Sequence, residues 1–103
     1  MKDGFLKIAC VTPPLRVADC VYNTEQIIHS ARTAAEAGVR LAVFPELCLT
    51  GYTCGDLFLQ ETLLRGAEDG LVRILKETAD LQMLVIVGLP YAHCGALYNC
   101  AAV

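Results

Sequence analysis

Hydrophobic and polar positions divide the chain into continuous apolar runs and stretches with a helical repeat. Four apolar runs predict strands, over residues 5–11, 39–44, 83–88 and 96–103. The first and third are apolar almost throughout, which is typical of strands covered on both faces. Prolines follow each of the first three runs, and they are expected to end these strands because proline cannot donate to a strand ladder.

The segment between the first two strands has the pattern of an amphipathic helix. Residues 23–37 place apolar side chains three and four positions apart, on one helix face. Asn23 is expected to cap this helix with Gln26 completing a capping box, and Gly38 suits the position after the last turn. The opposite stripe is polar and includes His29, which is predicted to be solvated.

More helix is predicted between residues 57 and 79, with Asp56 as its cap. Gly66 and Gly70 leave open whether this segment forms one helix or two. Short connections predict a parallel strand–helix–strand crossover for the first two strands. A turn at residues 93–95 makes the last two strands antiparallel. The pattern therefore predicts an α/β fold with a mixed sheet.

Composition adds an excess of apolar surface to this picture. Of the 103 residues 55% are hydrophobic and 18% are charged, so the chain has more apolar surface than a free-standing domain needs to bury. The last strand pattern, residues 96–103, stops without a polar tail. The expectation is a single unit, residues 1–103, that is incomplete at its C-terminal end.

Charge and hydropathy exclude several classes of function. The net charge is −3 and the Lys and Arg residues are scattered singly, unlike the basic patch of a nucleic-acid-binding protein. The longest apolar run, residues 83–87, is too short to span a bilayer. The N-terminal residues lack the pattern of a signal peptide. A cytoplasmic protein without nucleic-acid or membrane partners is expected.

Six cysteines would suit a disulfide framework in a short secreted protein, but no export signal supports that interpretation. No Cys-x-x-Cys pair is present, so no metal site is expected. The cysteines are predicted to be reduced and mostly buried, with Cys10 and Cys100 inside strands.

Candidate chemistry gathers at Phe44-Pro45-Glu46-Leu47. Glu46 follows a predicted buried strand, at the sheet edge where parallel sheets bind ligands. Its carboxylate is expected to be partly desolvated, which makes a carboxylate a stronger base. Pro45 restricts the backbone beside it. The alternative is an ordinary glutamate in a strand-to-loop turn.

The run Leu-Ala-Val-Phe-Pro-Glu-Leu-Cys-Leu-Thr-Gly-Tyr, residues 41–52, resembles the first signature of the nitrilase (carbon–nitrogen hydrolase) superfamily. Val-Gly-Leu-Pro in the third strand and Leu-Tyr-Asn in the fourth also fit that pattern, so the likeness covers nearly the whole chain. Members have an α-β-β-α sandwich and cleave amides or nitriles with a Glu-Lys-Cys triad. The resemblance implies the N-terminal part of such a sandwich, with Glu46 as the catalytic general base.

A narrower likeness lies in residues 51–58, Gly-Tyr-Thr-Cys-Gly-Asp-Leu-Phe, which resemble the glutamine-dependent NAD synthetases. It implies a glutaminase that supplies ammonia to an ATP-dependent synthetase domain, where deamido-NAD becomes NAD. The amidase part needs no cofactor, whereas ATP and Mg²⁺ are implied for the synthetase domain. Because members commonly self-associate, a homo-oligomer is expected.

The resemblance places the triad lysine and cysteine beyond residue 103, so this chain alone is expected to be inactive. Lys76 lies on a predicted helix and does not match the lysine. Cys48 and Cys54 are close to Glu46 in sequence, but they are expected to be packing or loop residues. Tyr52 is expected either to bind substrate or to pack on the sheet, and the sequence does not distinguish these two alternatives.

Tyr98 is predicted to be a structural strand residue. Two further functions remain as alternatives to the glutaminase. One is another amidase or carbamoylase of the same superfamily, and the other is a non-enzymatic α/β module.

Overall fold

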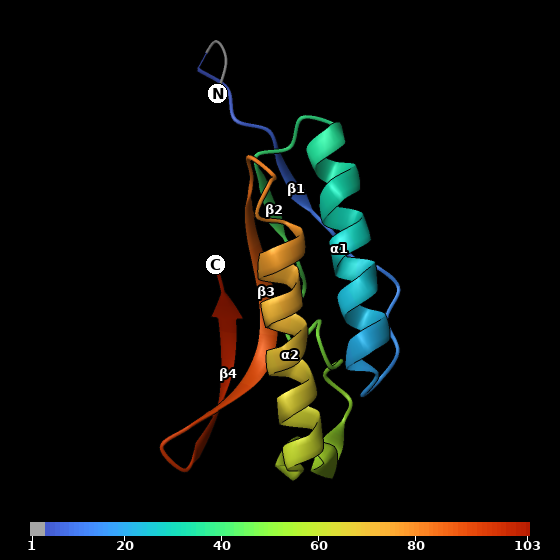
Figure 1. Cartoon of the computed structure of the whole chain (residues 1–103), viewed down its shortest axis with the longest axis vertical. Helices are drawn as coiled ribbons and strands as arrows, with labels where there is room; N and C mark the ends of the chain where they lie inside the picture. Colours follow the sequence, from blue (N-terminus) through green and yellow to red (C-terminus); the bar gives the residue numbers. More distant parts are fainter. Residues whose placement is uncertain (1–3) are drawn as a thin grey trace.

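The computed structural model describes residues 4–103, which form an α/β structure with one four-stranded sheet. The elements in chain order are β1 (Ile8–Cys10), α1 (Cys20–Glu36), β2 (Leu41–Val43), the 3₁₀ helix η1 (Gly55–Leu59), α2 (Glu61–Glu77), β3 (Leu84–His93) and β4 (Ala96–Ala102). The sheet order is β1-β2-β3-β4, with the first three strands parallel and β4 antiparallel to β3 (Figure 1). The predicted mixed sheet is confirmed.

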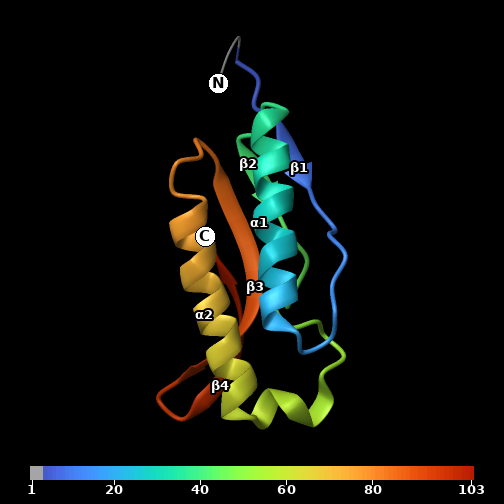
Figure 2. The same ribbon diagram turned by 45° about the vertical axis from the view of Figure 1, so that its right-hand side comes forward.

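Both helices cover the same face of this sheet, and the other face, here called the open face, is covered by neither helix (Figure 2). Strand register pairs Ile8 with Leu41 and Leu41 with Leu84, so these side chains share one face. Ile8 is 54% exposed and Leu84 is 60% exposed, which identifies theirs as the open face. The prediction that both faces of the first and third strands are covered is therefore wrong for residues 4–103. Two crossovers on one side give the sheet a single helical layer.

The core lies between the sheet and the two helices. Small side chains bring the layers together, because Ala31, Ala42 and Ala67 are fully buried. A Cβ atom on Gly70 would lie 2.3 Å from Thr24 Oγ1, so glycine lets α2 approach α1 closely. Gly66 and Gly70 both lie within α2 and do not interrupt it, whereas the predicted helical segment divides at Gln60, between η1 and α2.

Helix α1 begins three residues earlier than predicted. Its N-cap is Asp19, whose carboxylate accepts a hydrogen bond from the Tyr22 backbone N–H at 3.0 Å. Asn23 is not the cap, so the expected capping box with Gln26 is also wrong. Gly38 has φ +85°, as expected for the residue that follows a helix.

The predicted cap at Asp56 is also wrong. Asp56 lies inside η1, and α2 begins after Gln60, which makes no side-chain capping bond. Asp56 therefore belongs to the first turn of a separate short 3₁₀ helix and does not cap α2. His29 is exposed on α1, which confirms the prediction that it is solvated.

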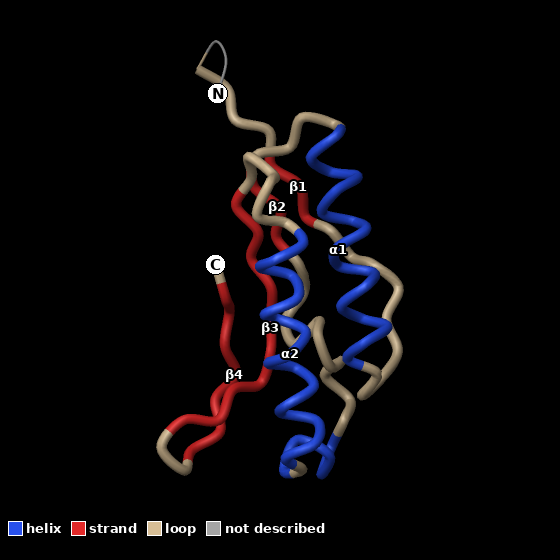
Figure 3. Tube along the Cα trace, in the orientation of Figure 1, coloured by secondary structure: helices blue, strands red, loops and turns tan. Residues whose placement is uncertain are grey.

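Strand β3 does not end at Pro90 but continues to the hairpin at residues 94–95 (Figure 3). The N–H of Leu84 and the carbonyls of Ile86 and Gly88 bond toward the β2 side of the strand. Pro90, two residues after Gly88, directs its nitrogen to that same side, beyond the end of β2. Its missing N–H therefore costs β3 no bond to β4.

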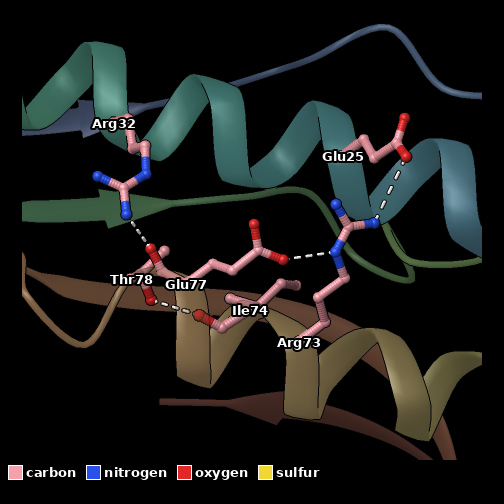
Figure 4. A network of polar contacts seen from close by, with 6 residues as sticks. All are labelled: Glu25, Arg32, Arg73, Ile74, Glu77 and Thr78. Carbon is pink, nitrogen blue, oxygen red and sulfur yellow. Dashed lines mark hydrogen bonds and ion pairs between the residues drawn. The ribbon is translucent and has the colours of Figure 1, made fainter.

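Polar contacts join α1 to α2 on the outer surface of the helical layer (Figure 4). Arg73 pairs with Glu77 at 2.5 Å and with Glu25 at 3.5 Å. Arg32 donates to the Glu77 carbonyl and pairs with Asp80 at 3.1 Å, and this hydrogen bond lowers the pKa of the Asp80 carboxyl. These pairs are exposed and contribute little to stability. Neither helix of residues 4–103 has the length and apolar character that crossing a membrane requires.

Candidate active site

The chain forms a compact turn immediately after β2, at the carboxyl end of that strand. The Pro45 carbonyl accepts from the Cys48 N–H at 3.2 Å, and the Leu47 carbonyl accepts from the Gly51 N–H at 2.7 Å. Leu47 has φ +51°, a left-handed conformation that a leucine rarely adopts. Such a conformation persists only where its surroundings hold it. Glu46 therefore sits in a turn that its neighbours must fix.

Strand β3 supplies one of these supports through Gly88. A Cβ atom at this position would lie 2.4 Å from the Leu47 nitrogen and 2.9 Å from the Pro45 carbonyl oxygen. The Gly88 carbonyl accepts from the Leu49 N–H at 3.2 Å, and its N–H donates to Cys48 Sγ at 3.4 Å. Only glycine allows the turn to lie this close to the strand.

Helix α1 supplies the second support through Asn23, which is buried. Its Nδ2 donates to the Leu49 carbonyl at 3.1 Å and to the Arg16 carbonyl at 2.8 Å, while its Oδ1 accepts from the Arg16 N–H at 2.7 Å. The Ala18 N–H also donates to the Thr50 carbonyl at 2.7 Å. The residue that was expected to cap a helix therefore ties the loop before α1 to the turn that carries Glu46.

The Glu46 side chain is exposed, so the partial desolvation expected for its carboxylate is absent from this chain. Its Oε1 accepts a hydrogen bond of 2.5 Å from Asn99 Nδ2, which comes from β4. Sequence reasoning gave Asn99 no role, although the Leu-Tyr-Asn pattern contains it. An isolated glycine in a strand pattern is a known sign of close backbone approach, and it could have pointed to Gly88.

A groove of about 230 Å³ lies beside this contact. Its walls are mostly apolar and are formed by Leu47, Phe58, Pro90, Leu97, Tyr98 and Asn99. Tyr98 is a residue of β4, as predicted, and it is also among the residues that line this groove. Tyr52 is 74% exposed, so it does not pack on the sheet, and it is not among the residues that line this groove.

The cysteines nearest to Glu46 are packing residues, as predicted. Cys48 and Cys54 are buried in the core, and burial raises the pKa of the Cys48 thiol, which disfavours a reactive thiolate. All six cysteines are free. Cys10 and Cys94 are exposed, so the prediction that the thiols are mostly buried is confirmed for only some of the cysteines. Lys76 is exposed in the last turn of α2, which confirms its predicted place on a helix.

Comparison with known proteins places this geometry in a family. The model of the carbon–nitrogen hydrolase family matches residues 7–103. A protein of Mycobacterium tuberculosis named glutamine-dependent NAD(+) synthetase is 39% identical over 102 residues, which are 99% of this chain and 15% of that protein. A protein of the same name from Saccharomyces cerevisiae is 35% identical over 78 residues, 76% of this chain and 11% of that protein.

Solved structures agree on the fold. The crystal structure of a glutamine-dependent NAD(+) synthetase from Cytophaga hutchinsonii superposes with a TM-score of 0.85 at 30% identity, covering 93% of this chain and 16% of that one. An amidase from Nesterenkonia sp. shares the fold at a TM-score of 0.69 and 24% identity, covering 87% of this chain and 34% of that one. With its Phe-Pro-Glu turn, its mixed sheet and a family match from residue 7 to residue 103, this chain belongs to the carbon–nitrogen hydrolase family.

Proposed function

We propose that residues 1–103 form the N-terminal part of a glutamine-hydrolysing amidase domain in a glutamine-dependent NAD synthetase. The observation that carries this proposal is the turn after β2, which presents the carboxylate of Glu46 at the carboxyl end of a parallel strand. The narrower assignment rests on 39% identity over 99% of the chain to a protein with that name. The chain spans about 15% of the length of such relatives, so the remaining catalytic groups belong to other segments.

In the proposed reaction Glu46 is the general base. It takes the proton of a cysteine thiol from outside this chain, and the sulfur attacks the side-chain amide carbon of glutamine. A lysine, also from outside this chain, stabilises the oxyanion of the tetrahedral intermediate. Glu46 returns the proton to the leaving nitrogen, ammonia departs and a thioester remains. Glu46 then takes a proton from water, which attacks the thioester, and returns that proton to the cysteine sulfur as glutamate leaves and the thiol is regenerated.

Further parts of the proposal concern the complete protein. The ammonia passes to an ATP-dependent domain that converts deamido-NAD to NAD, and ATP and Mg²⁺ act there and not in the amidase. Tyr52 is proposed to contact glutamine, and its ring is free to do so because it is exposed. The complete protein is proposed to be a cytoplasmic homo-oligomer.

A substrate comparison with the full-length protein tests this function. Glutamine, ATP and deamido-NAD together should yield NAD, and ammonium chloride should replace glutamine as the nitrogen source. Ammonia should be released from glutamine faster than from simple aliphatic amides or carbamoyl compounds. Rapid hydrolysis of one of those amides, with glutamine untouched and no NAD formed, would overturn the synthetase assignment in favour of another amidase of the family.

A further inference from the structure

The contact between Asn99 and Glu46 joins two parts of the chain that are 53 residues apart. Asn99 pairs with Pro90 across the β3–β4 ladder, so its side chain stands on the same face as the Gly88 position, over which the Glu46 turn passes. The pairing of β3 with β4 therefore fixes the backbone position of Asn99, and Gly88 fixes how close the turn lies to the strand. The hydrogen bond spans the short remaining distance between two supported backbones.

The chemistry of the two groups fixes the direction of this bond. An ionised carboxylate only accepts hydrogen bonds, so the amide nitrogen of Asn99 must face Oε1. Within residues 4–103, Asn99 is the sole donor to the Glu46 carboxylate, which also forms no ion pair there. The second oxygen, Oε2, therefore has no donor from the described part of the chain and is available to accept a proton.

We propose that Asn99 is the positioning residue of Glu46, holding Oε1 so that Oε2 faces the group whose proton is transferred. The inference rests on the proposed function of Glu46 as general base. Asn99 thereby orients the Glu46 carboxylate without touching the reacting atoms itself.

An alternative role for Asn99 would be purely structural, and exposure argues against it. Both side chains are exposed, and exposed polar pairs contribute little to the free energy of folding. Substituting Asn99 should therefore leave stability nearly unchanged while altering catalysis. A small misplacement of a catalytic group is enough to cost up to about a hundredfold in rate.

The test compares Asn99→Ala and Asn99→Asp with Gln82→Ala in the full-length protein. Gln82 is a matched control, since its exposed side-chain amide accepts from the charged Arg40 at 3.3 Å, before β3 begins. Asn99→Ala should lower kcat/KM for ammonia release from glutamine about tenfold. Asn99→Asp should lower it further and move the acid limb of the pH profile upward by about one unit, because two carboxylates then face each other. Gln82→Ala should match the parent.

A second measurement separates positioning from substrate binding and from folding. In the full-length protein both Asn99 variants should lower kcat, leave KM for glutamine close to that of the parent and keep the parent's unfolding midpoint, and Gln82→Ala should change none of the three.

These results separate the two proposals. If glutamine hydrolysis survives Glu46→Gln, the proposed function fails, whatever the Asn99 variants do. If Glu46→Gln abolishes hydrolysis but both Asn99 variants keep the parent kcat and pH profile, the positioning role of Asn99 fails alone. A fall in rate that follows a matching fall in the unfolding midpoint, with the pH profile of Asn99→Asp unmoved, would also overturn that role.

Discussion

At the scale of single residues, burial divides the cysteines into two chemical groups. Cys10 and Cys94 are exposed, whereas Cys20 and Cys48 are buried. Burial is the largest cause that raises the pKa of the Cys20 thiol to about 11, and it also raises the pKa of Cys48. Since the thiolate is the reactive form, the buried thiols should be slow to react.

Alkylation of the native chain with iodoacetamide at pH 8, followed by peptide mass spectrometry, checks this. Cys10 and Cys94 should be modified first, and Cys20 and Cys48 should be modified only after urea unfolds the chain. Modification of Cys20 or Cys48 at the rate of Cys94 in the native chain would contradict the buried positions.

Single residues also show which parts of the candidate site can be predicted from sequence. Glu46 could be selected as a candidate residue because its motif is local, with Pro45 and Leu47 directly beside it. Asn99 could not, because its contact depends on the register of β3 against β4 and on the depth at which the turn sits over Gly88. Neither quantity is visible in a linear pattern. The exposure of Glu46 was missed for a related reason, since a local motif does not reveal which segments pack over it.

At the scale of elements, the turn and β3 fit together only because position 88 has no side chain. Gly88→Ala places a carbon 2.4 Å from the Leu47 nitrogen, and backbone atoms on both sides cannot move aside as a flexible side chain would. The variant should lose about 1–3 kcal/mol of unfolding free energy, the usual cost of overpacking. Urea unfolding of the chain measures this loss.

The control for Gly88→Ala is Ala92→Val, which enlarges an exposed residue of the same strand. It should unfold at the urea concentration of the parent. An unchanged midpoint for Gly88→Ala would show that the turn can move away from β3 without cost, and would remove the support proposed for Glu46.

The contact between α1 and α2 makes a second prediction at this scale. Gly70→Ala should gain about 1 kcal/mol of helix propensity. It should nevertheless destabilise the chain, since the new carbon lies 2.3 Å from Thr24 Oγ1. Thr24 Oγ1 is buried and has no hydrogen-bond partner among the described residues, so its removal opens space without breaking a bond.

A double-mutant cycle measures this coupling. In the Thr24→Ala background, Gly70→Ala should cost less unfolding free energy than it does in the parent chain. Gly66→Ala serves as a comparison on the same helix, where the new carbon would meet Cys20 Sγ at 3.2 Å. Equal costs for Gly70→Ala in both backgrounds would contradict the close contact.

Element type and order were predictable from the sequence, while element ends were not. Helical and strand periods gave the α/β order and the antiparallel last pair. The N-cap was assigned to Asn23 because cap residues and buried polar residues have the same side chains, and only tertiary contacts distinguish Asp19 from Asn23. Pro90 was taken as a strand end because the side of the strand that its nitrogen faces depends on pairing.

At the scale of the whole molecule, the open face of the sheet accounts for the apolar excess of the composition. Ile8 and Leu84 lie on this face, on either side of Leu41 in the neighbouring strand. The 103-residue chain alone should therefore bind the dye ANS and self-associate as its concentration rises, because exposed apolar patches promote both.

The double variant Ile8→Thr/Leu84→Thr should reduce dye fluorescence and association in sedimentation velocity. Val72→Thr is the control, since Val72 is similarly exposed but lies on α2, in the helical layer. Equal behaviour of the double variant and Val72→Thr would show that the open face is not the source of association. The composition predicted an excess of apolar surface. The position of that surface on the open face follows because both helical crossovers lie on the opposite face of the sheet.

The central claim is that Glu46 is the general base of an amidase. The most direct measurement is the rate of ammonia release from glutamine by the full-length protein with Glu46→Gln, beside Glu36→Gln, an exposed glutamate at the end of α1. Glu46→Gln should lower kcat about a thousandfold, within the range that general-base catalysis contributes, and Glu36→Gln should keep the parent rate. Undiminished ammonia release by Glu46→Gln would contradict the account.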